Sequence, residues 1–211
     1  LPRPMSLLTA GARPSILIKV VGEGTRRLAR AEPGERFDLL APLGRAWSPP
    51  RARRAVLVAG GVGLAPLLFF AREIAADPSL PRPLALYGGR TARDLPLADE
   101  LAAVTELRVA TEDGSRGTKG RVTTLLDAAL ADADGIELYT CGPDAMMAAV
   151  AELAERAGAP CEASLETPMA CGYGVCLGCP VALREGGYLY ACVEGPCVDA
   201  RAIAWRKEPR S

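Results

Sequence analysis

Four cysteines in the C-terminal part of the sequence have a spacing that suits metal-cluster chemistry. Cys171, Cys176, Cys179 and Cys192 form the pattern C-x4-C-x2-C-x12-C. Its first three members have the C-x4-C-x2-C spacing of loops that wrap 2Fe–2S clusters. Glycines between the ligands allow positive φ and bring backbone N–H groups close to the sulfides. Those glycines are Gly172, Gly174 and Gly178. The pattern therefore predicts a 2Fe–2S cluster held by these four cysteines.

Other chemistries remain open for the same residues. Zinc also takes four thiolates, but its sites usually consist of two short C-x2–4-C pairs, and only Cys176 and Cys179 form one. A disulfide framework has little support because nothing in the sequence indicates secretion. A dithiol redox pair would leave Cys171 and the glycines unexplained. Cys161 and Cys197 are expected to be small buried apolar residues, although Cys197 is close enough in sequence to exchange with Cys192 as a ligand.

A glycine-rich turn marks a second candidate site. Gly60, Gly61, Gly63 and Pro66 follow the apolar run 55–59 and open a predicted helix over 64–75. Glycines there allow a tight turn and let a pyrophosphate approach the helix N-terminus, where free N–H groups favour anions. A tight turn with a purely structural role is the alternative. The strand–turn–helix context favours a nucleotide-binding turn.

Cys141, Gly142 and Pro143 follow the predicted strand 136–140, at the edge where open α/β sheets bind ligands. Cys141 has two equally supported interpretations: a residue beside a nicotinamide ring, with Gly142 permitting close approach, or a buried cysteine before an ordinary helix start. The sequence contains no histidine, which removes histidine-based acid–base catalysis. No residue is therefore assigned a certain catalytic role.

The elements that must position these residues divide the chain into three zones. Residues 1–50 contain short strand-like runs at 15–21 and 37–40. Residues 51–158 alternate strand and helix, which predicts a doubly wound parallel sheet. The predicted strands there are 55–59, 84–87, 107–111 and 136–140, and the helices are 64–75, 122–130 and one that starts at Pro143. Residues 159–211 break the rhythm and carry most of the cysteines, so the expected fold class is α/β plus β.

Composition excludes several partners. The 211 residues include 25 Lys and Arg against 25 Asp and Glu, and this zero net charge argues against nucleic acid. No apolar stretch reaches the roughly 18 residues that span a bilayer, so no membrane association is expected. The sequence begins with Leu1 and lacks the apolar core of a signal peptide, which suggests a trimmed chain. Thiolate-bound iron fits a reducing cytoplasm.

Two N-terminal segments indicate a function only when they are considered together with the other motifs. Arg3-Pro4-Met5-Ser6 and Gly24-Thr25 each have the composition of a surface loop, although Arg can bind a phosphate with two hydrogen bonds. Followed by the glycine turn, Cys141-Gly142-Pro143 and the cysteine pattern, they resemble the ferredoxin reductase-like superfamily. The stretches 166–179 and 192–196 are similar to the signature of one of its families, the electron-transfer subunits of NAD-dependent (class 1B) dihydroorotate dehydrogenase.

The resemblance implies an FAD-binding β-barrel over 1–50 whose first strands are missing, an NAD-binding domain over 51–158 and a 2Fe–2S domain over 159–211. The residues implied to hold FAD are Arg3, Pro4, Met5, Ser6, Leu17, Ile18, Lys19, Gly24 and Thr25. Those implied to hold NAD are Gly60, Gly61, Gly63, Pro66, Cys141, Gly142 and Pro143. Met5 stands where many relatives carry tyrosine, so aromatic stacking on the flavin is lost there.

The implied activity is electron transfer in pyrimidine biosynthesis. Electrons from dihydroorotate would reach FMN in a separate catalytic subunit, then the 2Fe–2S cluster, FAD and finally NAD+, in a heterotetramer that contains each subunit twice. A flavin is needed because nicotinamide exchanges two electrons at once and a cluster only one. Two alternatives remain: a flavin and iron–sulfur reductase subunit serving an oxygenase, hydrogenase or transhydrogenase, and a non-catalytic, zinc-stabilised nucleotide-binding module. The choice between NAD and NADP stays open.

Overall fold

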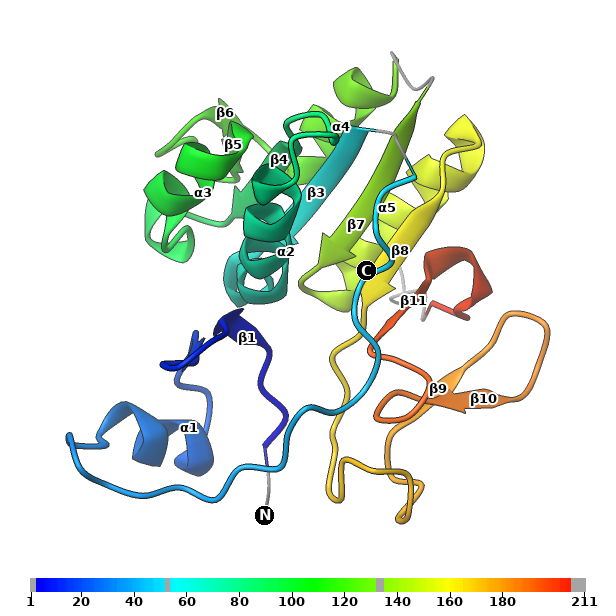
Figure 1. Cartoon of the computed structure of the whole chain (residues 1–211). Coiled ribbons are helices and arrows are strands. Elements are labelled where there is room, and N and C mark those ends of the chain that lie inside the picture. Colours follow the sequence, from blue (N-terminus) through cyan, green and yellow to red (C-terminus); the bar gives the residue numbers. More distant parts are fainter. Residues whose placement is uncertain (1–2, 52–53, 132–134, 206–211) are drawn as a thin grey trace.

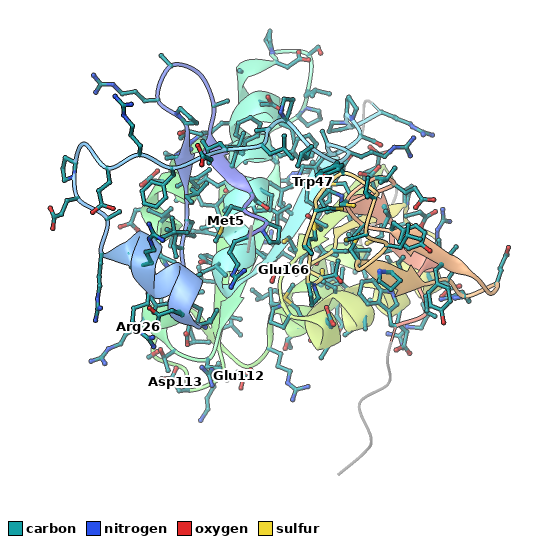
Figure 2. The ribbon with its side chains drawn as sticks, turned by 90° about the horizontal axis from the view of Figure 1, so that it is seen from below. Met5, Arg26, Trp47, Glu112, Asp113 and Glu166 are labelled. Atoms are coloured by element: carbon teal, nitrogen blue, oxygen red, sulfur yellow. The ribbon has the colours of Figure 1, made fainter. Side chains whose placement is uncertain are left out.

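The computed structural model describes residues 3–51, 54–131 and 135–205 (Figure 1). Its centre is a seven-stranded sheet in the order β11-β8-β7-β3-β4-β5-β6. The strands β3 to β8 in this sheet pair in parallel, and β11 is antiparallel to β8. Their bounds are β3 Arg54–Gly60, β4 Leu84–Gly89, β5 Glu106–Thr111, β6 Thr118–Lys119, β7 Ile136–Cys141, β8 Cys161–Ser164 and β11 Cys197–Asp199. The arrowhead of β7 points towards the side from which Figure 2 views the molecule.

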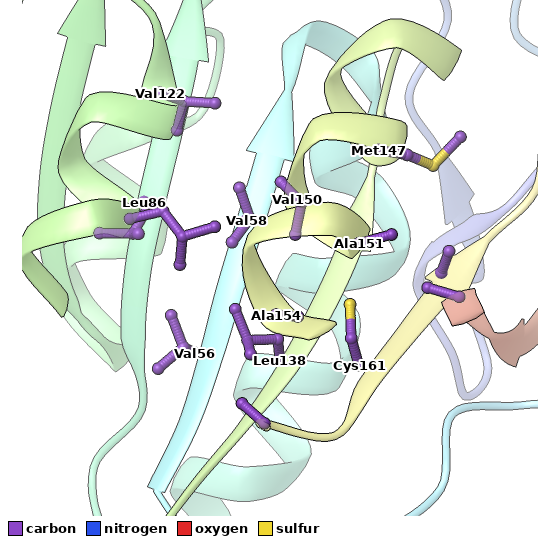
Figure 3. Close-up of a cluster of buried hydrophobic side chains, with 14 of the residues drawn as sticks. Val56, Val58, Leu86, Val122, Leu138, Met147, Val150, Ala151, Ala154 and Cys161 are labelled. Atoms are coloured by element: carbon purple, nitrogen blue, oxygen red, sulfur yellow. The ribbon is translucent and has the colours of Figure 1, made fainter. Parts of the chain in front are cut away.

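Helices cover both faces of this sheet. Successive side chains of a strand point to opposite faces, so β3 contributes to two separate cores. Leu57 packs in a core with the helices α2 (Leu64–Ala76) and α3 (Ala98–Val104). Val56 and Val58 pack on the other face with α4 (Val122–Leu130) and α5 (Asp144–Ala157) (Figure 3). Burial on both faces explains why β3 is a continuous apolar run, and it confirms the parallel sheet predicted from the sequence.

The predicted elements of the central zone are confirmed, with small differences at their ends. The four predicted strands are β3, β4, β5 and β7, and the three predicted helices are α2, α4 and α5. Pro143 lies at the N-cap of α5, one position before the helix begins at Asp144. The helix α3 was not predicted, because seven residues are too few for a helical period to stand out.

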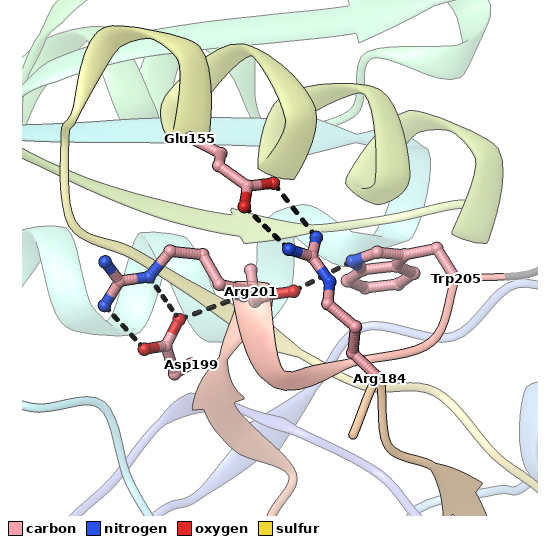
Figure 4. Close-up of polar contacts among 6 residues, drawn as sticks. Glu155, Arg184, Asp199, Arg201 and Trp205 are labelled. Carbon is pink, nitrogen blue, oxygen red and sulfur yellow. Dashed lines mark hydrogen bonds and ion pairs between the residues drawn. The ribbon is translucent and has the colours of Figure 1, made fainter. Parts of the chain in front are cut away.

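The C-terminal zone contributes to the central sheet as well as forming its own structure. β8 and β11 extend the sheet, while β9 (Pro180–Ala182) and β10 (Tyr188–Tyr190) form a separate antiparallel pair. Arg184, which follows β9, forms two hydrogen bonds at 2.6 and 3.0 Å to the carboxylate of Glu155 on α5 (Figure 4). These bonds connect the β9–β10 hairpin to α5, the helix that follows Cys141. The boundary between residues 158 and 159 stays a prediction.

The N-terminal zone corrects two sequence expectations. β1 (Leu7–Thr9) and β2 (Ser15–Ile16) form a short antiparallel pair, and α1 covers Glu23–Ala29. The predicted strand over 15–21 is therefore reduced to two residues, and residues 37–40 form no strand. Val21 and Leu39 are 78% and 82% exposed. A β-rich run becomes a strand only where a neighbour pairs with it, and among the described residues neither 17–21 nor 37–40 pairs with another strand.

The last residues of the N-terminal zone, 47–50, form a linker that packs on the sheet through the ring of Trp47. The ring of Trp47 lies 6.1 Å from that of Phe70 on α2 and 5.7 Å from that of Tyr139 on β7, measured between centroids. The backbone N–H of Ser48 donates to Glu162 at 3.0 Å. Arg72 on α2 also donates to the Leu8 carbonyl of β1 at 2.9 Å. These contacts hold the N-terminal zone against the central sheet.

We expect Trp47→Ala to lower the free energy of unfolding by about 2 kcal/mol. The loss is smaller than for a fully buried aromatic residue because Trp47 is only half-buried. Urea denaturation followed by circular dichroism measures it. Tyr188→Ala removes an aromatic ring that is 64% exposed and serves as control, with an expected change within about 0.5 kcal/mol. Equal losses in both variants would contradict a role for the Trp47 cluster.

No helix in the described ranges is long and apolar enough to cross a bilayer.

Candidate functional site

Two turns meet at the carboxyl edge of the sheet. Parallel strands end at the same edge, and β3 pairs with β7 so that Ala59 lies opposite Cys141. The glycine turn after β3 forms a short 3-10 helix, Gly61–Gly63. It therefore lies beside the turn Cys141–Pro143 after β7. The structure thus brings together the two motifs that sequence analysis assigned to the dinucleotide.

Three glycines of these turns are required by packing alone. A Cβ on Gly63 would lie 2.4 Å from the Cys141 carbonyl oxygen, and one on Gly60 would lie 2.8 Å from Cδ of Pro143. Gly142 has φ +154°, and its Cβ would lie 3.0 Å from the Cα of Gly60. These contacts are with backbone or ring atoms and leave no space for a side chain. For these three residues, a structural role of the glycines is confirmed.

Gly61 differs from its neighbours. Its φ is +54°, which favours glycine, yet no atom lies within 4 Å of where its Cβ would stand. The backbone at this position is therefore open on that side. α2 follows directly, with no side-chain cap and no acidic residue in its first turn. An open turn before an uncapped helix start fits the pyrophosphate of a dinucleotide.

Pro66 belongs to the first turn of α2, where a missing N–H costs no intrahelical hydrogen bond. Its carbonyl lies 3.4 Å from the indole nitrogen of Trp47, which donates to it. The observed contact of Pro66 is therefore with the linker.

Cys141 is buried, with 2% of its surface exposed. Loss of solvation, together with the nearby Glu166 carboxylate, raises the pKa of its thiol far above the usual range. Its Sγ lies 4.0 Å from Oε1 of Glu166. Cys141 is therefore a neutral thiol and is unsuited to act as a nucleophile. Burial agrees with one of its two interpretations, and proximity to nicotinamide stays a prediction.

Sequence analysis missed two neighbours of Cys141. Ser164, at the end of β8, is buried, and its side chain partly offsets the rise in the thiol pKa of Cys141 and of Cys197. Glu166, which is labelled in Figure 2, follows two positions later, and its carboxyl group contacts the thiol of Cys141 although the residue as a whole is exposed. The only signal in the sequence was the position of Glu166 at the start of the signature stretch 166–179.

The four predicted cluster cysteines form two pairs. In one pair, the N–H of Cys176 points at Sγ of Cys171 at 3.5 Å. In the other, Sγ of Cys179 and Sγ of Cys192 lie 3.3 Å apart, and both residues are buried. All the cysteines are free thiols. In the described part of the chain, no three acidic or sulfur ligands converge on a single metal position. Two pairs suit a centre with two metal ions, each bound by two thiolates.

Backbone N–H groups of the loop are directed at these sulfur atoms. Hydrogen bonds from the backbone of Cys176 and Tyr173 lower the pKa of Cys171 to about 6. The N–H of Gly178 donates to Sγ of Cys176 at 3.4 Å. Such bonds stabilise negative charge on sulfur, as a thiolate-bound cluster requires. The loop residues therefore fit an iron–sulfur group. Cys161 is buried, as predicted, and Cys197 is half-buried beside Ser164.

The segments assigned to FAD lie together in part. The guanidinium of Arg3 packs on α1, where a Cβ at Gly24 would lie 3.0 Å from Nε of Arg3. Thr25 is buried, and its hydroxyl accepts from the N–H groups of Val21 and Gly22. Gly24 and Thr25 therefore belong to the first turn of a helix and not to a loop, which corrects the sequence expectation.

The other residues assigned to FAD have little recorded contact. Met5 is half-buried and Pro4 and Ser6 are exposed, all just before β1. Leu17 and Ile18 are half-buried and Lys19 is exposed, in irregular chain after β2. Their roles at FAD stay predictions.

Sheet, glycine turn and cysteine loop together define an oxidoreductase with a nucleotide-binding domain of the ferredoxin reductase type. Residues 57–152 match the model of the oxidoreductase NAD-binding domain, and residues 166–204 match that of the iron–sulfur cluster binding domain of dihydroorotate dehydrogenase B. A structure of an NADH-dependent reduced ferredoxin-NADP oxidoreductase, solved to study flavin-based electron bifurcation, is 30% identical with a TM-score of 0.81. The match covers 90% of this chain and 68% of that one. A Neisseria gonorrhoeae ferredoxin NADP+ reductase, 18% identical with a TM-score of 0.54 over 74% of this chain and 72% of that one, shares the fold.

Curated relatives identify the family. The electron transfer subunit of dihydroorotate dehydrogenase B (NAD(+)) from Caldanaerobacter subterraneus subsp. tengcongensis is 36% identical over 90% of this chain and 74% of its own length. The same subunit from Desulforamulus reducens is 35% identical over 97% of this chain and 80% of its own length. The chain belongs to the family of dihydroorotate dehydrogenase B (NAD(+)) electron transfer subunits. The resemblance noted in the sequence is thereby confirmed, and a catalytic partner subunit is implied.

Proposed function

We propose that this chain passes electrons from a dihydroorotate-oxidising partner to NAD+ with the help of FAD and a 2Fe–2S cluster. The observation that carries the proposal is the continuity of the two sites. β8 ends at Ser164 beside Cys141, and the same stretch of chain leads through Glu166 into the cysteine loop. When bound, the flavin supplies the exchange between two-electron and one-electron steps.

The carboxyl edge of the sheet binds the dinucleotide in this proposal. Gly61 leaves its backbone open, and the turn Gly61–Gly63 leads into a helix start without a side-chain cap, where the pyrophosphate would lie. β7 adjoins β3 on one side and β4 adjoins it on the other. The nicotinamide end would therefore lie towards Cys141, and the adenosine end towards the loops after β4 and β5. Cys141 contributes packing there, because its thiol is neutral and buried.

The cysteine loop binds the cluster in this proposal. Cys171 and Cys176 would hold one iron, and Cys179 and Cys192 the other, because these are the pairs the loop brings together. The N–H groups of Cys176 and Gly178 would hold the negative charge of the thiolates. Cys179 and Cys192 are buried and would exclude water from one side of the cluster.

The FAD site is supported by the contact between Arg3 and α1. Arg3 brings a guanidinium to the glycine at the first turn of the helix, an arrangement that suits a phosphate. Met5 and Ser6 follow just before β1, which Arg72 holds against α2. The flavin ring would therefore lie between the N-terminal zone and the carboxyl edge of the sheet.

The partner supplies the oxidation of dihydroorotate. We infer an FMN-containing catalytic subunit in a heterotetramer with each subunit present twice, in the cytoplasm. The sequence contains no histidine, and the buried Cys141 is not an acid–base group at neutral pH. Neither histidine nor Cys141 of this chain is therefore available for removing the protons of dihydroorotate, and we infer that the partner holds the acid–base group.

The test is anaerobic co-purification of the chain with its partner. Expected are iron and acid-labile sulfide in equal amounts, FAD with this chain, and reduction of NAD+ by dihydroorotate only when both subunits are present. The chain alone should oxidise NADH with an artificial acceptor and form no orotate. Orotate formation by the isolated chain, or zinc in place of iron, would contradict the proposal.

A second candidate function has support from one comparison. The chain is 30% identical to an NADH-dependent reduced ferredoxin-NADP oxidoreductase with a TM-score of 0.81, so it could serve a different electron-transfer complex. Co-purification separates the two: a dihydroorotate-oxidising partner supports the first function, and a partner that reduces ferredoxin or NADP supports the second.

The carboxyl group of Glu166 makes stability depend on pH. Loss of solvation and, less strongly, the charge of Asp144 raise the pKa of Glu166. A raised carboxyl pKa means that the folded state disfavours the carboxylate, so stability falls as the pH rises from the unfolded pKa of about 4.3 through the folded pKa. We expect Glu166→Gln to be more stable than the wild type, with a larger difference at pH 8 than at pH 5.

Urea denaturation at both pH values measures this difference. Glu152→Gln removes the same charge from an exposed position on α5 and is expected to change stability by less than about 0.5 kcal/mol. A gain for Glu166→Gln that shrinks towards pH 8 would show that the carboxylate is stabilised in the folded state.

A further inference from the structure

The buried tyrosine of β4 is bonded to the glycine turn. Tyr87 has 0% of its surface exposed. Its hydroxyl oxygen lies 2.9 Å from the carbonyl oxygen of Gly61 and 3.2 Å from that of Pro96, so its single proton is shared between the two acceptors and the bond to Gly61 is the shorter. The sequence motifs give no role to Tyr87. The hydroxyl joins the turn after β3 to the loop after β4, the two segments that flank the middle of the carboxyl edge.

The protonation state of Tyr87 suits this task. Burial, together with the charge of Asp94, raises the pKa of its phenol, so the hydroxyl keeps its proton and remains a donor. Both acceptors are backbone carbonyls and cannot donate in return. The Gly61 carbonyl also accepts from the backbone N–H of Leu64 in the 3-10 turn, so the phenol of Tyr87 adds a second hydrogen bond that comes from the neighbouring strand. The bond therefore favours one orientation of the Gly61 carbonyl.

That orientation has a consequence for the next amide. In a trans peptide the C=O and the following N–H point in opposite directions. The Gly61 carbonyl points inward at Tyr87, so the N–H of Val62 points to the opposite side of the turn. Gly61 holds the φ of +54° that the turn needs and is open where a side chain would stand. The buried hydroxyl of Tyr87 thus sets the direction of the Val62 N–H, the group that a pyrophosphate would meet.

We propose that Tyr87 is a positioning residue for the dinucleotide, which holds the Gly61–Val62 peptide with its N–H towards the pyrophosphate. This inference rests on the proposed binding of NAD at the carboxyl edge. Tyr87 has no contact with solvent, so it acts through the glycine turn.

The chain offers a matched control for this role. Tyr139 on β7 is also buried, with 2% of its surface exposed, and its hydroxyl donates to a backbone carbonyl, that of Ser48, at 3.1 Å. Ser48 belongs to the linker and not to the glycine turn. Tyr87→Phe and Tyr139→Phe therefore each remove one buried hydroxyl from a tyrosine of the sheet, and only the first loosens the turn.

The experiment compares the variants in the complex with the partner subunit, with NADH as the probe and an artificial electron acceptor. For Tyr87→Phe we expect the KM for NADH to rise roughly 2- to 12-fold, the range set by one hydrogen bond. The kcat should change less than about twofold, with unaltered flavin and cluster spectra, because the loss concerns binding. Tyr139→Phe should leave the KM for NADH within about twofold of the wild type.

Two further variants keep the inference testable if Tyr87→Phe folds poorly. Tyr87→4-aminophenylalanine restores an N–H donor and should return the KM to near the wild-type value. Tyr87→4-fluorophenylalanine fills the same space without a donor and should behave as Tyr87→Phe. Equal KM values for these two variants, or an equal rise in Tyr139→Phe, would overturn the role of Tyr87. A wild-type complex that fails to oxidise NADH would instead refute the proposed function itself.

Discussion

Cys179→Ser is expected to remove the iron–sulfur cluster completely. Cys179 is buried, and its Sγ lies 3.3 Å from Sγ of Cys192, so it supplies half of one thiolate pair. Serine has nearly the same shape, but its hydroxyl is a hard oxygen donor that stays protonated, whereas the cluster requires a soft thiolate. Iron and acid-labile sulfide analysis, with the visible spectrum of anaerobically purified protein, measures the loss.

Electron transfer is expected to separate into two parts in this variant. NADH oxidation with an artificial two-electron acceptor should persist, because the nucleotide edge is built from other elements. Transfer between NAD+ and dihydroorotate through the partner should fall below detection, since the proposed path includes the cluster. Stopped-flow measurement of the two reactions in the reconstituted complex distinguishes these outcomes.

Cys161→Ser is the matched control for this prediction. Cys161 is also a buried free thiol, with 3% of its surface exposed, but it lies in β8 within the core of the sheet. Serine there places a hydroxyl in an apolar core and should lower the free energy of unfolding by about 1 to 3 kcal/mol without loss of iron. Full iron content in Cys179→Ser, or loss of iron in Cys161→Ser, would contradict the ligand assignment.

Gly63→Ala has the second largest expected effect. The added methyl group would lie 2.4 Å from the carbonyl oxygen of Cys141 and 2.7 Å from the backbone nitrogen of Gly142. Both neighbours are backbone atoms at the end of a central strand, so neither can move without separating β3 from β7. We expect the free energy of unfolding to fall by about 3 kcal/mol, at the upper end of the usual range for overpacking.

Binding of NADH should weaken in the same variant, because the two turns at the carboxyl edge are pushed apart. Fluorescence titration with NADH measures binding, and urea denaturation measures stability. Gly158→Ala is the control: Gly158 has φ +68° after α5, with no atom within 4 Å of its ideal Cβ. It should cost about 1 kcal/mol from backbone strain and leave NADH binding unchanged. Similar losses of NADH binding in both variants would contradict the role of the tight packing at Gly63.

Local patterns were sufficient for the central sheet and for the candidate ligands. The run 55–59 is apolar throughout because β3 is buried on both faces, and a glycine turn with a helix behind it is a signal confined to neighbouring residues. The spacing of Cys171, Cys176 and Cys179 is likewise local, since one loop supplies all three. Each of these features depends only on residues that are close together in the sequence, so it could be predicted without knowledge of the fold.

The N-terminal zone was predicted poorly for a related reason. Val20, Val21, Leu39 and Leu40 have the composition of strands, but a strand exists only where another backbone pairs with it. In the described residues these positions are exposed and unpaired. The sequence shows the preference of a segment for β-structure and does not show whether a partner is present.

The sequence by itself determined the parallel α/β sheet, the glycine turn before α2 and the cysteine loop. Only the tertiary structure decided which side chains support them. Glu166 lies 25 positions after Cys141 and Tyr87 lies 26 positions after Gly61, and each pair meets because parallel strands end at one edge. Such contacts depend on the order of the strands and on how deeply each side chain is buried, and both are set only when the whole sheet has formed. No pattern among residues that are close in the sequence predicts these contacts.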